Sequence, residues 1–328
     1  MKRLRMWTAA CVLVGMASSA VADTITNGQK MAEAFMRGDV QTVWSASTDE
    51  MRAAFVSMDQ MRALRENFLA QFGTEAAVLS ERALQQHGYD VYARLSRWSG
   101  ADQLTEVIIS FDDAERVAGF LVRPTPDAAP SAHLDYRTKA RLRLPVEGAW
   151  YVYWGGRAIE DNYHAADEGQ RFAIDLLVRA DGKSYAGDPS LLESYFCWGE
   201  PILAPAAGVV VSVVDGLPDQ PIGSTDPQRP AGNHVVMDFG DGEYGFFAHF
   251  RRGSVRVSAG EEVSAGAEIG LCGNSGNTSE PHLHFHLQTT PHLGSGEGLP
   301  AQFIDYEANG VPVARGEPKR AETVKQRD

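Results

Sequence analysis

The spacing of apolar residues in this 328-residue chain changes at Gly73, and that change limits the folds open to it. Before Gly73, from Ile25 to Phe72, apolar side chains recur at helical intervals. After it the period changes to two, as expected for strands, over residues 91–95 and 107–111, and a third apolar run follows at 117–122. Helices followed by an antiparallel meander make an α+β domain, which we predict for residues 23–123.

The second half of the chain, residues 150–312, is rich in short apolar runs and glycines and has no long helical period. This pattern predicts a mostly antiparallel all-β domain, either a sandwich or a barrel. A Pro/Ala-rich stretch begins at Pro124, and we assign residues 124–149 to a linker and a lead-in strand. Residues 313–328 carry mixed charge and are expected to form a solvated tail.

The N-terminus predicts export. Lys2, Arg3 and Arg5 precede an apolar stretch of 12 residues, which is too short to span a bilayer comfortably. The small-x-small sequence at residues 20–22 then matches a signal peptidase site. We therefore predict that residues 1–22 are a cleaved signal peptide, that no membrane span remains, and that the mature protein is periplasmic or secreted. An uncleaved anchor helix is the alternative.

Charge and cysteine content follow from this export. The net charge of −13 falls to −16 once the three basic residues of the leader are removed, which argues against a nucleic-acid partner. Cleavage also leaves two cysteines, Cys197 and Cys272. An even count in an oxidising compartment favours a disulfide between them, and two buried free thiols are the alternative.

Polar residues with possible chemistry gather in three segments of the second half. On a strand over residues 281–286, His282, His284 and His286 share one face, and a metal would satisfy their ring nitrogens. The alternative is a surface strand of histidines. His249 stands alone among aromatic residues, and Asp175 leads a buried-looking apolar run, where a carboxylate needs a partner or a metal. Each of these two residues is ambiguous alone.

Together, Asp175, His249, His282 and His284 occur in the order and sequence settings of the lysostaphin-like (LytM-type) zinc endopeptidases, which this half of the chain resembles. The resemblance covers about residues 150–290. The elements that carry it include residues 199–205, 232–236, 247–250 and 281–285.

The resemblance implies a zinc (Zn²⁺) site with one carboxylate and two histidine ligands. Asp175 and His284 match two of them, but Arg171 stands where the family usually has its first histidine, and a guanidinium does not bind zinc. We assign His164 as the displaced third ligand. A site with only two protein ligands is the alternative.

The same resemblance implies that His249 and His282 are catalytic, through proton transfer and oxyanion stabilisation. His286 would orient a neighbouring ligand. The implied function is a zinc metalloendopeptidase that hydrolyses peptide bonds in bacterial peptidoglycan. The alternatives are a non-catalytic cell-wall regulator, similar to amidase activators, and a peptidoglycan-binding module.

The N-terminal domain resembles, at the level of its pattern over residues 26–123, the nuclear transport factor 2-like domains. It contains no catalytic set of its own, so we expect it to position or restrain the peptidase; added stability is the alternative. The strand from Tyr92 to Trp98, with Arg94 and Arg97, is expected to expose aromatic and basic side chains to glycan or to a cell-wall partner protein.

Overall fold

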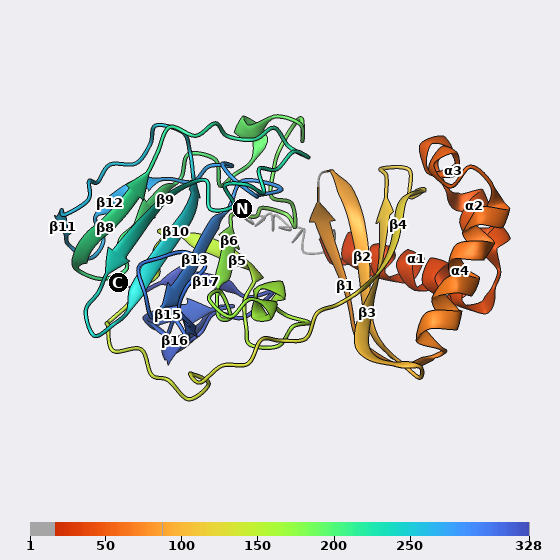
Figure 1. Ribbon diagram of the computed structural model, residues 1–328. Coiled ribbons are helices and arrows are strands. Elements are labelled where there is room, and N and C mark those ends of the chain that lie inside the picture. The colour runs from red at the N-terminus through yellow and green to blue at the C-terminus, as the bar shows by residue number, and fades with distance from the viewer. Residues whose placement is uncertain (1–16, 87, 328) are drawn as a thin grey trace, which may run out of the picture.

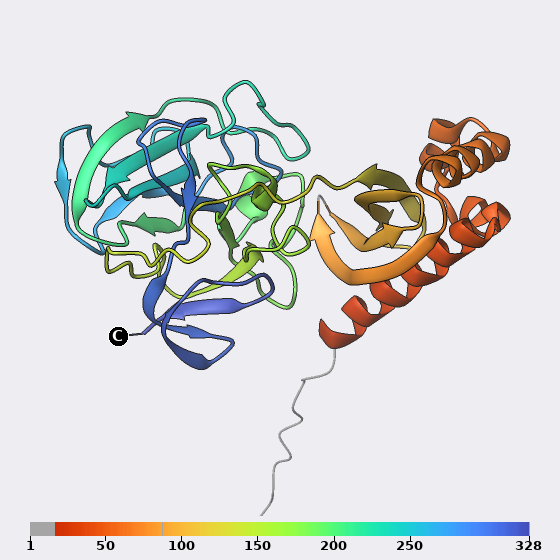
Figure 2. The same ribbon diagram turned by 60° about the horizontal axis from the view of Figure 1, so that its bottom comes forward.

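The structure is a computed structural model that describes residues 17–86 and 88–327 (Figures 1 and 2). Within these residues the chain forms an N-terminal unit of helices on a four-stranded sheet, followed by a C-terminal unit built from antiparallel strands. The predicted fold class, α+β followed by mostly antiparallel β, is confirmed. Residues 1–16 of the predicted signal peptide lie outside the described residues. None of the described helices combines the length and hydrophobicity needed to cross a membrane.

Side-chain caps divide the N-terminal helical segment. Asp39, Thr48 and Ser57 each accept a hydrogen bond from a backbone N–H in the first turn of the helix that follows, and Gly73, at φ 78°, ends the last helix. The helices are α1 (Ala17–Arg37), α2 (Val40–Ala46), α3 (Asp49–Phe55) and α4 (Met58–Phe72).

The N-terminal sheet is antiparallel in the order β1 (Glu75–Gln86), β2 (Tyr89–Trp98), β3 (Ala101–Phe111) and β4 (Val117–Pro124). Both ribbon views place the helices on one side of it, where Phe35 packs with Val107 and Ile109. The sequence pattern does not predict β1, because its Glu, Ala, Leu and Gln residues favour helices. Pairing with β2 along its length overrides that local preference.

The expected exposure of the β2 side chains is wrong for Tyr92, Arg94 and Trp98, whereas Arg97 is exposed as predicted. Tyr92 and Trp98 are buried, and Trp98 packs edge-on against Phe68 of α4. Arg94 is also buried, in an ion pair with Glu75. Tyr92 and Trp98 pack the helices onto the sheet, and Arg94 joins β2 to β1, so these three side chains are not free to contact glycan or a partner protein. The relation to nuclear transport factor 2-like domains stays a prediction.

The C-terminal unit is built on one long antiparallel sheet. Its strands follow the order β11-β8-β9-β10-β13-β6-β5-β17-β15-β16, with β14 beside β13, while β7 and β12 pair separately. The strand bounds are β5 (Ala149–Trp154), β6 (Ile174–Leu177), β7 (Pro201–Leu203), β8 (Gly208–Val214), β9 (Asn233–Asp238), β10 (Tyr244–Phe250), β11 (Glu262–Val263), β12 (Glu268–Leu271), β13 (Leu283–Gln288), β14 (Gly298–Leu299), β15 (Phe303–Ala308), β16 (Val311–Gly316) and β17 (Thr323–Gln326). Two 3₁₀ helices, η1 (Tyr163–Ala166) and η2 (Leu192–Ser194), interrupt the connections.

Two boundary predictions are corrected. The segment 124–149 contains no strand before β5, and its residues Leu142, Leu144 and Val146 are buried in the core of the C-terminal unit. The expected tail is instead part of the sheet: within residues 313–327, β17 lies between β5 and β15, and Val324 is fully buried although its neighbours are exposed. Alternating apolar residues and strand pairing outweigh the mixed charge of these segments.

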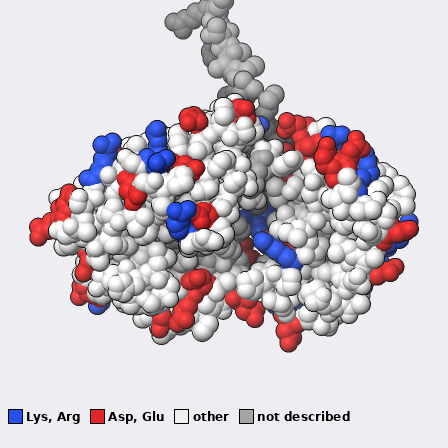
Figure 3. All heavy atoms as spheres, turned by 45° about the horizontal axis from the view of Figure 1, so that its top comes forward, with Lys and Arg blue, Asp and Glu red and all other residues white. Residues whose placement is uncertain are grey.

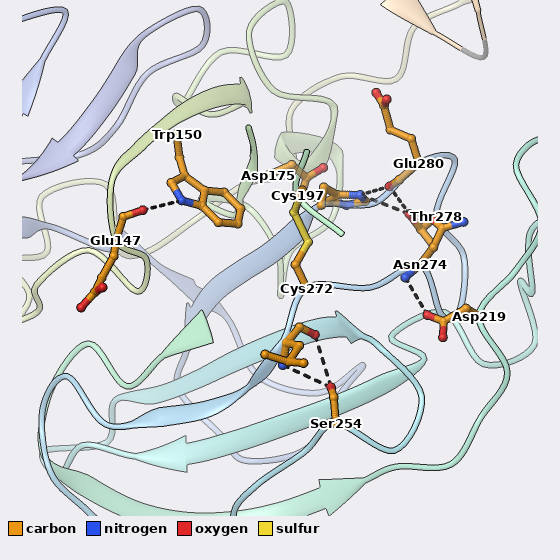
Figure 4. Close-up of a disulfide and its surroundings, with 12 residues drawn as sticks. Glu147, Trp150, Asp175, Cys197, Asp219, Ser254, Cys272, Asn274, Thr278 and Glu280 are labelled. Carbon is orange, nitrogen blue, oxygen red and sulfur yellow. Dashed lines mark hydrogen bonds and ion pairs between the residues drawn. A yellow bond between two sulfur atoms is a disulfide. The ribbon is translucent and has the colours of Figure 1, made fainter. Parts of the chain in front are cut away.

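The predicted disulfide between Cys197 and Cys272 is present, with its Cα atoms 6.0 Å apart (Figure 4). Backbone hydrogen bonds flank it, from Gly199 to the Cys272 carbonyl and from Cys272 to the Glu200 carbonyl. The bridge therefore joins the segment before β7 to the loop that leads from β12 to β13.

We predict that replacing both cysteines by serine lowers the free energy of unfolding of the C-terminal unit by roughly 4 kcal/mol, because the bridge closes a loop of 75 residues in the unfolded chain. Urea denaturation followed by tryptophan fluorescence measures this loss. Reduction of the wild-type protein should bring its midpoint down to that of the double variant. Equal midpoints for the oxidised wild type and the variant would contradict the prediction.

Candidate metal centre

Three buried side chains converge on one point of the C-terminal unit: His164, Asp175 and His284. The Nε2 atom of His164 lies 3.1 Å from Oδ2 of Asp175, and Nδ1 of His284 lies 2.9 Å from Oδ1 of the same carboxylate. One ligand atom from each residue falls within 4.8 Å of the others. The structure thus brings together the three residues assigned as metal ligands from the sequence.

Strand pairing sets two of the three positions. Asp175 on β6 and His284 on β13 are direct partners in the antiparallel register, so their side chains lie on the same face of the sheet. On the far side of β13, Ala248 of β10 pairs with His284, which brings the end of β10 to the same place. The β-sheet therefore fixes the distance between the carboxylate and the imidazole.

Asn162 positions His164. Its side-chain oxygen accepts a hydrogen bond from the His164 backbone N–H at 3.2 Å, and its amide nitrogen donates to the carbonyls of Gly156 and Ala173, each at 2.9 Å. Asn162 is fully buried, and Ala173 lies two residues before Asp175. This side chain therefore ties η1 to the start of β6 and holds the third ligand toward Asp175.

Arg171 does not belong to the cluster. Its guanidinium donates to the carbonyl of Arg157 at 2.9 Å and lies over the ring of Phe172. The place that the family pattern gives to a histidine is thus used for packing, and the 3₁₀ helix η1 supplies the imidazole instead.

His249 and His282 lie beside the cluster, with their ring centroids 4.7 Å apart. His249 Nδ1 lies 2.8 Å from the carbonyl oxygen of Ser275, and His282 Nδ1 lies 2.8 Å from that of Glu280. A carbonyl only accepts hydrogen bonds, so Nδ1 carries the proton in each ring and Nε2 is left for the site. His282 Nε2 is 3.7 Å from Oδ1 of Asp175.

His249 holds its position in a left-handed backbone conformation, at φ 67°. The pairing register of β10 with β9 shifts between Phe247 and Phe250, which creates an irregularity around this residue. Such conformations persist only where surrounding contacts hold them. Here the contacts are the Ser275 carbonyl and the hydrogen bond from the His249 N–H to Ala231.

The loop after Cys272 supplies the partners of both histidines, and Figure 4 shows the hydrogen bonds that fix it. Asn274 donates its N–H to Asp219, and the Thr278 hydroxyl donates to the Glu280 carbonyl. At Gly273 a Cβ atom would lie 2.2 Å from the backbone nitrogen of Arg251, so only glycine allows this close approach.

His286 and Gln288 continue the cluster along β13. His284 Nε2 lies 2.9 Å from Nδ1 of His286, which stacks on the ring of Phe246 with only 8° between the ring planes. His286 Nε2 in turn faces the side-chain oxygen of Gln288 at 3.3 Å. This row leaves Nδ1 of His284 directed at Asp175, as in metal sites where an outer partner orients a ligating imidazole.

The pKa values of Asp175, His249 and His284 are shifted in directions that suit metal binding. Burial would raise the pKa of Asp175, but the neighbouring His164 and His282 and the hydrogen bonds to it hold the pKa well below its usual value. Burial lowers the pKa of His249 well below its usual value, and His282 and His284 lower it further. Burial likewise lowers the pKa of His284. An ionised Asp175 and a neutral His284 are the forms in which these two residues can bind a metal.

The donor set fits zinc. Zinc binds imidazole nitrogen and carboxylate oxygen in tetrahedral sites at about 2.0–2.2 Å, which places neighbouring ligand atoms roughly 3.3 Å apart. The separations of 3.1 and 2.9 Å from the Asp175 oxygens are close to that spacing. Three protein ligands leave a fourth position, which is the pattern of a catalytic site.

Residues 195–294 match the model of Peptidase family M23. This range contains β10 and β13, with His249, His282 and His284. The C-terminal unit is of the M23 peptidase type. His164 and Asp175 lie before the matched range in the sequence. In the structure they cluster with His284, which lies within it.

Among curated proteins, the M23-type unit is similar to the peptidoglycan DD-endopeptidase ShyA of Vibrio cholerae, at 34% identity over 90 residues; this is 27% of this chain and 18% of the relative. It is also similar to Endolysin 2638A of Staphylococcus phage 2638A, at 39% identity over 61 residues, which is 18% of this chain and 12% of the relative. The chain thus spans less than a fifth of either relative.

Among solved structures, the catalytic domain of the prophage-encoded M23 protein EnpA of Enterococcus faecalis aligns with 48% of this chain and 92% of its own length, at 21% identity and a TM-score of 0.30.

Glu280 is a buried acid next to this site that the sequence reasoning missed. It is the one Asp or Glu between Cys272 and Gln288, which is the signal that could have found it. Its carboxylate accepts a hydrogen bond from the Ser184 hydroxyl at 2.7 Å. Burial raises the pKa of Glu280 to about 7, against the opposing effects of Ser184 and Arg179.

We predict that Glu280→Gln removes a pH-dependent loss of stability. A carboxyl with a folded-state pKa of about 7, against 4.5 unfolded, stabilises the fold most below pH 4.5, and this stability is lost as the pH rises through 7. The variant should therefore gain roughly 2–3 kcal/mol over the wild type between pH 5 and pH 8. Urea denaturation at several pH values tests this, with the exposed Glu193→Gln as control. Parallel pH profiles for wild type and Glu280→Gln would refute it.

Proposed function

We propose that this protein is a secreted zinc metalloendopeptidase that hydrolyses peptide bonds in bacterial peptidoglycan. The observation that carries the proposal is the buried cluster of His164, Asp175 and His284, with the free Nε2 atoms of His249 and His282 beside it. The family match supports a peptidase, and the name of the similar Vibrio cholerae protein supports peptidoglycan as the substrate.

The residues of the chain divide the chemistry between them. His164, Asp175 and His284 would hold the metal; zinc, when bound, lowers the pKa of a water molecule toward 7 and polarises a peptide carbonyl. His249 presents an unprotonated Nε2, because burial lowers its pKa and Nδ1 donates to Ser275. It is suited to accept a proton from the attacking water. His282 Nδ1 is fixed the same way by the Glu280 carbonyl, and its Nε2 also faces the site. Once that atom takes up a proton, the imidazolium would donate it to the carbonyl oxygen or the leaving amine.

Periplasmic or extracellular action is part of the proposal. The predicted signal peptide would export the chain, and the disulfide between Cys197 and Cys272 is a bond that oxidising compartments favour. Peptidoglycan lies in the same compartment.

We predict about one zinc per chain in the purified protein, and its loss in His284→Ala and His164→Ala. Metal analysis by mass spectrometry gives the stoichiometry. His234→Ala is the matched control: this histidine is also partly buried in the C-terminal unit, but its Nδ1 is bonded to the Gly232 carbonyl and it is outside the cluster. Full zinc content in His164→Ala would remove that residue from the ligand set.

We predict that His249→Ala and His282→Ala keep their zinc but lose roughly 10²–10⁴-fold in the rate of peptidoglycan hydrolysis, since each removes a proton-transfer or oxyanion group. Chromatography of the released muropeptides measures the rate, and the exposed His292→Ala serves as control. Wild-type rates in both variants would overturn these roles. Zinc binding without any hydrolysis by the wild type would favour the regulator or the binding module instead.

A further inference from the structure

The cavity that contains the candidate metal centre has a second wall from the N-terminal unit. It measures about 950 Å³, and its lining includes His164, His249 and His284 on one side and residues of β1–β4 on the other. The space-filling view shows a hollow between the two lobes of the molecule, with Lys or Arg side chains in it (Figure 3). The site therefore opens toward the four-stranded sheet.

The sheet turns one whole face toward this cavity. Neighbouring residues across the strands, Ala93, Ile108 and Leu121, form an apolar row that lines it. The opposite face packs on the helices through Val107 and Ile109. Leu121 is 48% exposed. The N-terminal unit therefore leaves part of this apolar face accessible to a ligand in the cavity.

Next to the apolar row lies a basic one. Glu106 forms ion pairs with both Arg82 and Arg123, the latter at 2.9 Å, and all three residues line the cavity. Two guanidinium groups thus share one carboxylate, which leaves one positive charge uncompensated. The Arg123 side chain is 55% exposed, and the described residues give its guanidinium no other hydrogen-bond partner.

Contacts across the cavity hold this wall in place. The Arg82 guanidinium lies 5.6 Å from the centre of the Trp154 ring on β5, which also packs against Arg320 at 4.1 Å. Arg82 is thereby engaged in joining the two units, whereas Arg123 remains available to a ligand.

The opposite wall carries the reverse charge. Apart from Glu106, the Asp and Glu side chains that line the cavity come from the C-terminal unit: Glu160, Asp167, Asp175 and Glu280. While no metal is bound, this distribution of charge attracts an anionic group that enters the cavity toward the sheet. A guanidinium with a free edge is well matched to a carboxylate, which it binds in two parallel hydrogen bonds.

We propose that the four-stranded sheet is the second wall of the substrate cleft and that Arg123 binds a carboxylate of the peptide substrate there. This inference rests on the proposed function for its substrate and adds a specificity residue that lies outside the M23-type unit. The apolar row beside Arg123 would contact the aliphatic part of the same peptide.

Binding to the full-length protein, treated with a chelator so that no hydrolysis occurs, tests the inference. The probes are a synthetic stem peptide, its side-chain amide and its C-terminal amide, titrated by calorimetry. We expect the peptide to bind about tenfold more tightly than one of the two amides, which identifies the carboxylate concerned. Arg123→Gln should abolish this preference, Arg123→Lys should keep part of it, and Arg62→Gln on the exposed face of α4 should leave it unchanged.

Equal affinity of the wild type for all three peptides, or an unchanged preference in Arg123→Gln, would overturn the inference. Hydrolysis of the same peptides by the zinc-loaded wild type reports separately on the proposed function. Cleavage of all three peptides without any difference in affinity would support the function and refute the role of Arg123. A preference in binding without cleavage would refute the function and support the role of Arg123.

Discussion

The burial of the Asp175 carboxylate is the constraint on which the rest of the site depends. An isolated buried charge is costly, and the chain compensates it with three imidazoles from two segments. The antiparallel pairing of β6 with β13 brings the first of these, His284, and η1 brings His164. Without the carboxylate, these buried imidazoles would lack a common partner.

The orientation of His249 and His282 depends on backbone carbonyls that accept hydrogen bonds from their Nδ1 atoms. The loop between Cys272 and β13 provides the Ser275 and Glu280 carbonyls, and the disulfide and Gly273 hold that loop against the neighbouring strands. Loops carry the chemistry here, but the sheet and the covalent bridge remove their freedom. The geometry of His249 and His282 is therefore set before any ligand binds.

The two units divide charge as well as structure. The M23-type unit contributes the candidate metal ligands and most of the acids around the cavity, whereas the N-terminal sheet contributes Arg82 and Arg123 in a protein whose net charge is −13. Among the described residues, the M23-type unit itself lines the cavity with acidic side chains and histidines, and contributes no Lys or Arg to it. Because the basic side chains lie on a separate sheet, a substitution there could change substrate specificity without altering the candidate metal ligands.

The sequence alone determined much of this protein. Alternation and helical spacing predicted both fold classes. Asp175, His249 and His284 were identified because their order and sequence settings resemble those of the lysostaphin-like endopeptidases. The predictions from the sequence that proved wrong concern segments whose structure depends on pairing with distant parts of the chain. β1 has a sequence typical of a helix, and β17 has one typical of a charged tail. Both form strands because they pair with β2 and β5, respectively. The sequence proposed His164 in place of Arg171, but only the tertiary structure placed it against Asp175, buried Glu280, and set Arg123 on the cavity of the candidate metal centre. These facts depend on contacts between residues far apart in the chain, which no local pattern encodes.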